Sequence, residues 1–361
     1  MNKKMAVVVG TRPELIKMGV LIKEMKKRNS HHLYVHSGQH YDYHMDGMVA
    51  DIFGLPKPDY NLGVGSGSHA ATTAKIMVQL EEIIIREKID TIVVHGDTNT
   101  TLGACLAAAK LSIPVAHVEA GLRSFDKTMP EEINRILVDN MSTYLFAPTE
   151  EAVKNLNTEG INSGIYLVGQ SIVDAIEHVK HHNKINVLDI YGLDSKKYFF
   201  ITVHRQENTD NPIRLHSIFS SILDLATHPE SKLVLSMHPR TKKILAQQNL
   251  FQRLVDNPNI IILDPPPNFY HTIHLQYHAK LVITDSGGLQ EESCIIGTPC
   301  VTLRENTERP ETLECGANTL AGYQKEKILE AVKASILKKA GWTHPYGKTG
   351  ISKRILDIIL N

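Results

Sequence analysis

Residues 5–28 read MAVVVGTRPELIKMGVLIKEMKKR, and this stretch passes from a short apolar run through a glycine into an amphipathic segment. Residues 5–9 predict a buried β-strand, because the run is continuous, apolar and rich in valine. Beyond Gly10, apolar residues recur at three- and four-residue spacing, which predicts a helix. These residues are Leu15, Met18, Ile22 and Met25. A strand that leads into a helix is the repeating unit of a parallel sheet.

The same alternation continues along the chain. In the first half, strands are expected at residues 5–9, 33–36, 91–95, 115–118, 144–147 and 166–168. In the second half, they are expected at residues 199–203, 233–236, 259–263, 281–284 and 300–303. Each set is large enough for its own sheet, so the predicted fold class is α/β with two Rossmann-like, doubly wound, parallel-sheet domains.

The length also favours two domains, because 361 residues exceed what one hydrophobic core usually serves. Apolar periodicity lapses in the polar stretch 181–197, and the connection between the domains is expected near it, starting at about Gly169. We therefore expect a first domain of residues 1–170, joined by the amphipathic tail 350–361, and a second domain of residues 171–349. A ligand is expected in the interdomain cleft, outside the carboxyl ends of the strands.

Composition excludes several classes of protein. Lys plus Arg and Asp plus Glu are equal at 39 each, so no overall charge attracts nucleic acid or an acidic membrane. The apolar run at the amino terminus is too short for a signal peptide, and no stretch approaches the roughly 18 residues of a membrane span. The four cysteines are too scattered for a disulfide framework. We expect a cytoplasmic protein without a nucleic-acid or membrane partner.

In the first half, polar residues follow predicted strands directly. Carboxylates on three successive loops can converge on one cleft, and a site that removes and replaces a proton needs such groups. The candidate residues are Arg12, Lys17, Asp97, Glu119 and Glu131. Each also has a structural interpretation: Asp97 can be a helix N-cap, and Glu131 can favour the helix dipole.

In the second half, His204 and Arg205 follow one strand, and the sequence Ser286-Gly287-Gly288 follows another. Glycines let a backbone approach a ligand closely, and amides at a helix amino terminus can hold a diphosphate. Glu292, one turn further on, can accept hydrogen bonds from ribose hydroxyls. A plain glycine-rich turn is the alternative. Arg309 lies in a charged loop, 304–311, part of which we interpret as internal salt bridging.

No cofactor or metal is expected. The turn after the first strand has a single glycine and lacks the GxGxxG pattern of dinucleotide-binding proteins. His36, His40 and His44 recur at four-residue spacing, but the intervening Ser37-Gly38 favours a strand and loop over a helix with metal ligands. His117-x-Glu119 resembles half of a zinc deaminase signature, but its PCxxC partner is missing.

The loop sequences, taken in order, resemble the non-hydrolysing UDP-N-acetylglucosamine 2-epimerase family. The matching segments are GTRPELIKM, GQHYD, HGDTNTT, HVEAGLR, MPEEINR, FAPTE, HRQEN, HPR, TDSGGLQEE and ERPE. The resemblance implies a fold of the glycosyltransferase-B (GT-B) type, a homodimer, and an isomerase that interconverts UDP-GlcNAc and UDP-ManNAc without a cofactor. One departure is Asp42, where many bacterial members that regulate themselves through a second substrate molecule carry Gln.

The resemblance also implies roles for individual residues. The first domain would act on the sugar and the second would bind UDP. The catalytic residues would be Asp97, Glu119, Glu131, Lys17 and His204. The residues that bind the UDP-sugar would be Arg12, Lys17, His204, Arg205, Ser286, Gly287, Gly288, Glu292 and Arg309, with the glycine segment on the diphosphate and Glu292 on the ribose.

Other functions stay open at this point. The segments RSFD and HRQENTD also resemble relatives that act on UDP-2,3-diacetamido-2,3-dideoxyglucuronate. A GT-B glycosyltransferase, a hydrolysing epimerase and a non-catalytic nucleotide-sugar sensor are further alternatives. The sensor would leave the three carboxylates without a purpose.

Overall fold

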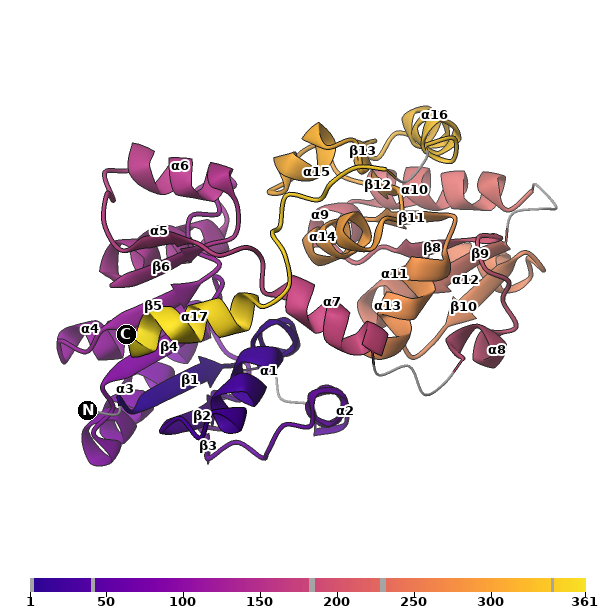
Figure 1. The fold of residues 1–361 in the computed structure, drawn as a ribbon. Helices are drawn as coiled ribbons and strands as arrows, with labels where there is room; N and C mark the ends of the chain where they lie inside the picture. Colours follow the sequence, from indigo (N-terminus) through magenta and orange to yellow (C-terminus); the bar gives the residue numbers. More distant parts are fainter. Residues whose placement is uncertain (1–2, 40–42, 182–185, 228–231, 339–340) are drawn as a thin grey trace. The chain divides into compact units, whose positions relative to one another are not determined.

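A computed structural model describes residues 3–39, 43–181, 186–227, 232–338 and 341–361. The chain folds into two compact units, Met1–His181 with Tyr346–Asn361, and His182–Pro345 (Figure 1). Each unit has its own parallel sheet and its own hydrophobic core.

The first unit is built on a seven-stranded sheet in the order β3-β2-β1-β4-β5-β6-β7, and every pair of neighbouring strands is parallel. Its elements are β1 (Met5–Val9), α1 (Arg12–Lys27), β2 (His32–His36), α2 (Tyr43–Phe53), β3 (Tyr60–Asn61), α3 (His69–Glu87), β4 (Thr91–His95), α4 (Asn99–Lys110), β5 (Val115–Val118), α5 (Pro130–Met141), β6 (Tyr144–Ala147), α6 (Glu150–Thr158), β7 (Ile165–Leu167), α7 (Ile172–His181) and α17 (Ile351–Leu360).

Helices form two groups in the first unit. Helix α1 packs against α2, α7 and α17, whereas α4 packs against α3 and α5 (Figure 1). The strand order reverses between β1 and β4, so right-handed crossovers place these two groups on opposite faces of the sheet. Because both faces are covered, β1 is buried along its whole length. The predicted apolar stripe of α1, from Leu15 to Met25, is buried as well.

The second unit repeats this plan with a six-stranded parallel sheet in the order β10-β9-β8-β11-β12-β13. Its elements are α8 (Val187–Tyr191), β8 (Tyr198–Thr202), α9 (Gln206–Thr209), α10 (Pro212–Leu225), β9 (Lys232–Ser236), α11 (Pro239–Gln247), α12 (Leu250–Val255), β10 (Ile260–Leu263), α13 (Phe269–His278), β11 (Leu281–Thr284), α14 (Gly287–Ile296), β12 (Cys300–Thr302), α15 (Pro310–Glu314), β13 (Asn318–Leu320) and α16 (Lys325–Ser335). The prediction of two doubly wound α/β domains is confirmed.

The carboxyl-terminal helix α17 belongs to the first unit, as its amphipathic sequence suggested. Asp174 on α7 accepts hydrogen bonds from the backbone amides of Gly350 and Ser352, both at 2.7 Å. Because α7 packs on α1 and holds the start of α17, the first unit extends to His181, whereas the sequence suggested a boundary after residue 170.

Candidate active site

The predicted site residues of the first unit gather where its strand order reverses. Strands β1, β4 and β5 are neighbours, and their carboxyl ends lead into the loops that carry Arg12, Asp97 and Glu119. Gly10 makes the close approach of these loops possible, since a Cβ there would lie 2.1 Å from Oγ1 of Thr100. Ligands of open α/β sheets bind at such a reversal.

Four buried side chains meet at this edge, and we call them the Glu119 cluster: Glu14, Lys17, His95 and Glu119. Nζ of Lys17 forms an ion pair with Oε2 of Glu119, and Nε2 of His95 lies 3.1 Å from the same oxygen. The backbone of Glu119 is left-handed, with φ at 78°. A residue other than glycine rarely adopts this conformation, and such strain is concentrated at functional sites.

Glu14 fastens the loops of the cluster together. Its Oε2 accepts hydrogen bonds from the backbone amides of Gly10 and Thr11, at 2.7 and 2.8 Å, and its Oε1 accepts one from Oγ1 of Thr98 at 2.6 Å. Burial raises the pKa of Glu14, and these hydrogen bonds oppose that rise. The sequence analysis gave no role to Glu14 or His95. Each lies near a glycine-containing turn, where a polar residue is expected even without a functional site.

Asp97 is held by α5. Nε and Nη2 of Arg135 donate to its Oδ2 at 2.9 and 2.6 Å, and its carboxylate is partly exposed. Asp97 is not the N-cap of α4, because that position belongs to Thr98. Arg135 also donates to the buried carboxylate of Glu132, whereas Glu131 is exposed in the first turn of α5.

A second layer of charged residues supports the Glu119 loop. Asp139 contacts Nδ1 of His117 at 2.7 Å, forms an ion pair with Arg123 at 2.7 Å and accepts a hydrogen bond from the amide of Gly121. His117 also donates from Nε2 to the carbonyl of Gly96 at 2.8 Å. This network joins the loops after β4 and β5, so it fixes the backbone on both sides of the Glu119 cluster.

In the second unit, buried Asp285 joins the loops after β8 and β11, the neighbouring strands where that sheet reverses. Its carboxylate accepts hydrogen bonds from the backbone amides of His204 and Arg205, and from Nδ2 of Asn208. The ring of His204 lies 5.8 Å from that of His238, centroid to centroid. The sequence placed Asp285 beside the glycines but gave it no role.

The amino terminus of α14 has the features of an anion site. Neither Gly287 nor Gly288 has a positive φ, and a Cβ at either position would meet only ordinary contacts, none closer than 3.8 Å. Neither backbone conformation nor packing therefore demands glycine. Nη2 of Arg205 is among the atoms at 3.8 Å from the Cβ position of residue 287. Its buried Nε has no hydrogen-bond partner among the described residues. We call Ser286, Gly287, Gly288 and Arg205 the α14 anion site.

The remaining candidates in the second unit are buried and paired. Nε2 of Gln276 on α13 donates to Oε2 of Glu292 at 2.5 Å. Nε of Arg309 donates to Glu291, one residue earlier on α14. In the first unit, Arg12 opens α1 and is half-buried.

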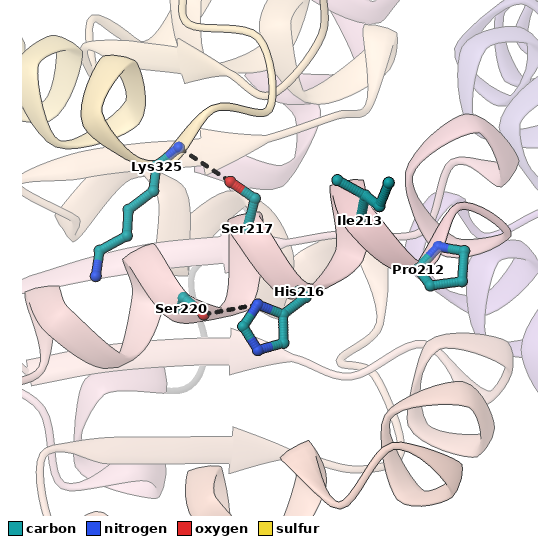
Figure 2. Close-up of a pocket in the computed structure, with 6 residues that line it drawn as sticks. All are labelled: Pro212, Ile213, His216, Ser217, Ser220 and Lys325. Carbon is teal, nitrogen blue, oxygen red and sulfur yellow. Dashed lines mark hydrogen bonds between the residues drawn. The ribbon is translucent and has the colours of Figure 1, made fainter.

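A pocket of the second unit lies along α10. Figure 2 shows its lining side chains: Nδ1 of His216 is hydrogen-bonded with Oγ of Ser220, and the backbone amide of Lys325, at the start of α16, donates to Oγ of Ser217. Its volume is about 570 Å³, and its lining residues are Pro212, Ile213, His216, Ser217, Ser220 and Lys325. No predicted site residue lines it.

Within the described residues, no three His, Cys, Asp or Glu side chains are grouped so that they can hold a metal ion. His40 and Asp42, which entered the sequence analysis, lie outside the described residues. No helix in the described ranges is long and apolar enough to span a membrane.

Comparison with known proteins agrees with this geometry. A sequence model of the family described as UDP-N-acetylglucosamine 2-epimerase matches residues 23–360. The UDP-N-acetylglucosamine 2-epimerase of Methanocaldococcus jannaschii is 46% identical over 99% of this chain and 98% of its own length. The UDP-2,3-diacetamido-2,3-dideoxy-D-glucuronate 2-epimerase of Pseudomonas aeruginosa is 38% identical over 93% of each chain.

The crystal structure of the Methanocaldococcus jannaschii UDP-GlcNAc 2-epimerase in complex with UDP-GlcNAc and UDP superposes with a TM-score of 0.91. It is 46% identical, over 99% of both chains. These matches confirm the predicted GT-B type of fold and the resemblance drawn from the ordered loop motifs. The chain belongs to the UDP-N-acetylglucosamine 2-epimerase family.

Proposed function

We propose that this chain interconverts UDP-GlcNAc and UDP-ManNAc, with the second unit binding UDP and the first unit acting on the hexose. The observation that carries the proposal is that each sheet has one functional cluster at its strand-order reversal: an anion site in one unit and a buried carboxylate cluster in the other. The similarity to the Methanocaldococcus jannaschii enzyme, 46% over nearly the whole chain, supports the same substrate.

The reaction explains why two clusters are needed. The proton on C2 of the sugar is not next to a carbonyl group, so direct deprotonation is difficult. When the C1–O bond to UDP breaks and a base takes the C2 proton, the electrons of the C2–H bond form a C1=C2 double bond. Re-addition of UDP at C1, with a proton delivered to the other face of C2, gives the epimer. No net oxidation occurs, so no redox cofactor is required.

The α14 anion site would stabilise the UDP that leaves. Backbone amides at a helix amino terminus and a guanidinium both favour negative charge, and these groups are already in place before the charge develops. The buried Nε of Arg205, which has no hydrogen-bond partner among the described residues, is available for a phosphate oxygen. We assign the ribose to Glu292, and further phosphate contacts to Arg12, His204 and Arg309.

The Glu119 cluster and Asp97 would handle the proton. Glu119 is buried beside Lys17, and Asp97 is partly exposed beside Arg135, so the two carboxylates have different surroundings. Environments that differ in this way let one carboxyl group act as acid while another acts as base. Glu131, exposed at the start of α5, is the third candidate.

Proton NMR of UDP-GlcNAc with the purified protein in D2O tests the proposal. An epimerase gives UDP-ManNAc with deuterium at C2, whereas a glycosyltransferase gives neither, and a hydrolysing epimerase releases free ManNAc. Asp97→Asn and Glu119→Gln should each slow C2 exchange by roughly 10²- to 10⁴-fold while UDP still binds. Unchanged exchange in either variant removes that residue from the mechanism.

The substituents on C3 and C6 of the sugar are the least constrained part of the proposal. The Pseudomonas aeruginosa relative, at 38% identity, favours UDP-2,3-diacetamido-2,3-dideoxyglucuronate as the second candidate. Comparing kcat/KM for the two substrates decides between them, and a higher value for the glucuronate would overturn the assignment. The homodimer that the family resemblance implies and the cytoplasmic location expected from the sequence pattern stay predictions, which light scattering and cell fractionation can test.

A further inference from the structure

His95 occupies a position that the proposed roles do not use. It ends β4, its side chain is buried, and Nε2 lies 3.1 Å from Oε2 of Glu119. Neither Nδ1 nor Nε2 makes a hydrogen bond among the residues that the structure describes, so the contact of Nε2 with Glu119 is close but is not aligned as a hydrogen bond. His117, one strand away, differs: Nδ1 contacts Asp139 and Nε2 donates to the carbonyl of Gly96. Pairing within the fold therefore does not explain this buried imidazole, whose Nε2 lies beside the carboxylate of Glu119.

The charges around His95 come from two elements. Helix α1 provides Glu14, whose charge interacts with His95, and Lys17, which pairs with Glu119. The loop after β5 provides Glu119 itself. Two buried carboxyl groups thus face one lysine and one histidine.

Lys17 and His95 both contact Oε2 of Glu119. Two contacts on one oxygen, from different elements, restrict rotation of the carboxylate about the bond that joins it to Cγ. The left-handed backbone of Glu119 also restricts where that side chain can point. Catalysis by a base requires such fixed geometry, because a displacement of 1 Å can cost about 100-fold in rate.

We propose that His95 is a positioning residue for the reaction: the contact of Nε2, together with that of Nζ of Lys17, orients the Glu119 carboxylate. The inference rests on the proposed role of Glu119 as an acid/base group. It assigns to His95 no contact with the substrate.

Two substitutions of His95 test the position of Nε2 and the position of Nδ1 separately. In His95→Gln, the amide nitrogen reaches about as far as Nε2 and keeps a polar nitrogen beside Glu119, although it cannot carry a charge. In His95→Asn, the amide lies near the place of Nδ1 and the contact is lost. We expect kcat to fall about 10-fold in His95→Gln and about 100-fold in His95→Asn, with KM within threefold of the original protein.

The difference in kcat between the two variants is the readout that a purely structural role would not move. Glutamine keeps a polar nitrogen near the place of Nε2 and asparagine does not, so kcat should fall less in His95→Gln than in His95→Asn, with KM the same in both. A purely structural role would lower the melting temperature without giving this order in kcat.

The outcomes distinguish the two proposals. If Glu119→Gln keeps C2 exchange in D2O, the role of Glu119 fails and the positioning role fails with it. If Glu119→Gln loses exchange while His95→Asn keeps kcat within twofold of the original protein, or falls no further than His95→Gln, only the inference about His95 is overturned. UDP affinity, measured by calorimetry, should be unchanged in all His95 variants and reports that they fold. Should His95→Asn fail to fold, kcat of His95→Gln still decides: a value within twofold of the original protein overturns the inference.

Discussion

Among single residues, a strained backbone and two glycines that the fold does not require occur at the proposed functional sites. Glu119 adopts a left-handed backbone at a cost of about 1–2 kcal/mol. The fold has room for a Cβ atom at positions 287 and 288, yet both residues are glycines. Neither feature helps the protein to fold, and each lies beyond the carboxyl end of a strand in its own sheet. A ligand accounts for them better than stability does.

Gly288→Ala should therefore stabilise the fold and weaken binding. The new Cβ meets Glu292 and Ser286 at 3.8 Å, and alanine loses less chain entropy on folding, so we expect a gain of about 0.5–1 kcal/mol. Nucleotide that must approach the amide closely would be displaced, and UDP affinity should fall about tenfold or more. Thermal melting and calorimetry with UDP measure the two effects.

Gly297, at the other end of α14, provides the control for this substitution. Its φ is 81°, so Gly297→Ala should cost about 1 kcal/mol of stability and leave UDP affinity unchanged. Equal UDP affinity in Gly288→Ala and the original protein would contradict the assignment of the diphosphate to this helix.

The sequence revealed some site residues and not others, for a physical reason. Lys17, Asp97 and Glu119 stand out as polar residues next to predicted strands, but a side chain that fastens a loop has the same signature. Only coordinates separate Asp285, which joins two loops by hydrogen bonds, from residues such as Arg205, whose buried nitrogen has no partner within the described chain.

At the scale of elements, helix α5 begins with two adjacent glutamates that have opposite surroundings. Glu132 is buried and accepts hydrogen bonds from the amides of Ser124 and Phe125 and from Arg135. Glu131 is exposed beside it. A helix turns 100° per residue, so neighbours in its first turn face different environments. Sequence alone cannot say which of the two faces the core.

Paired substitutions test this division of roles. Glu132→Gln should lower the free energy of unfolding by about 1–3 kcal/mol, because buried donors lose a charged acceptor. Glu131→Gln should leave stability within about 0.5 kcal/mol and reduce kcat by at least 100-fold. Urea unfolding and the D2O assay measure the two quantities. Active Glu131→Gln protein would restrict the acid/base candidates to Asp97 and Glu119.

The strands that could be predicted from the sequence are those with a long run of apolar residues. Every strand expected from a β-branched run is present, with ends that shift by about one residue. The two strands missed by the sequence analysis, β3 (Tyr60–Asn61) and β13 (Asn318–Leu320), are edge strands of two and three residues. Such strands bury too little apolar surface to leave a pattern, and they form because the neighbouring strand offers free backbone partners.

At the scale of the whole molecule, the two units repeat one topology but have different titratable groups. Helix α13 of the second unit carries His271, His274 and His278, and burial lowers the pKa of each of them. The positive charges of Lys196 and of the other histidines lower these pKa values further. Neutral imidazoles are therefore part of the folded second unit.

Acid should open the second unit as the histidines of α13 gain protons, and UDP should oppose that opening. A folded-state pKa below the usual 6.5 means that the stabilisation is complete above pH 6.5 and is lost as the pH falls through the folded-state value. Since the α14 anion site lies in the same unit, UDP at 100 times its dissociation constant should add about 2.7 kcal/mol there. Hydrogen exchange with mass spectrometry, between pH 7.5 and 5, should show early loss of protection in residues 186–338. His274→Gln should reduce the effect, and substitution of the exposed His216 should not. If His274→Gln leaves the loss of protection unchanged, the histidines of α13 do not control acid stability. If UDP gives no protection, UDP binds elsewhere.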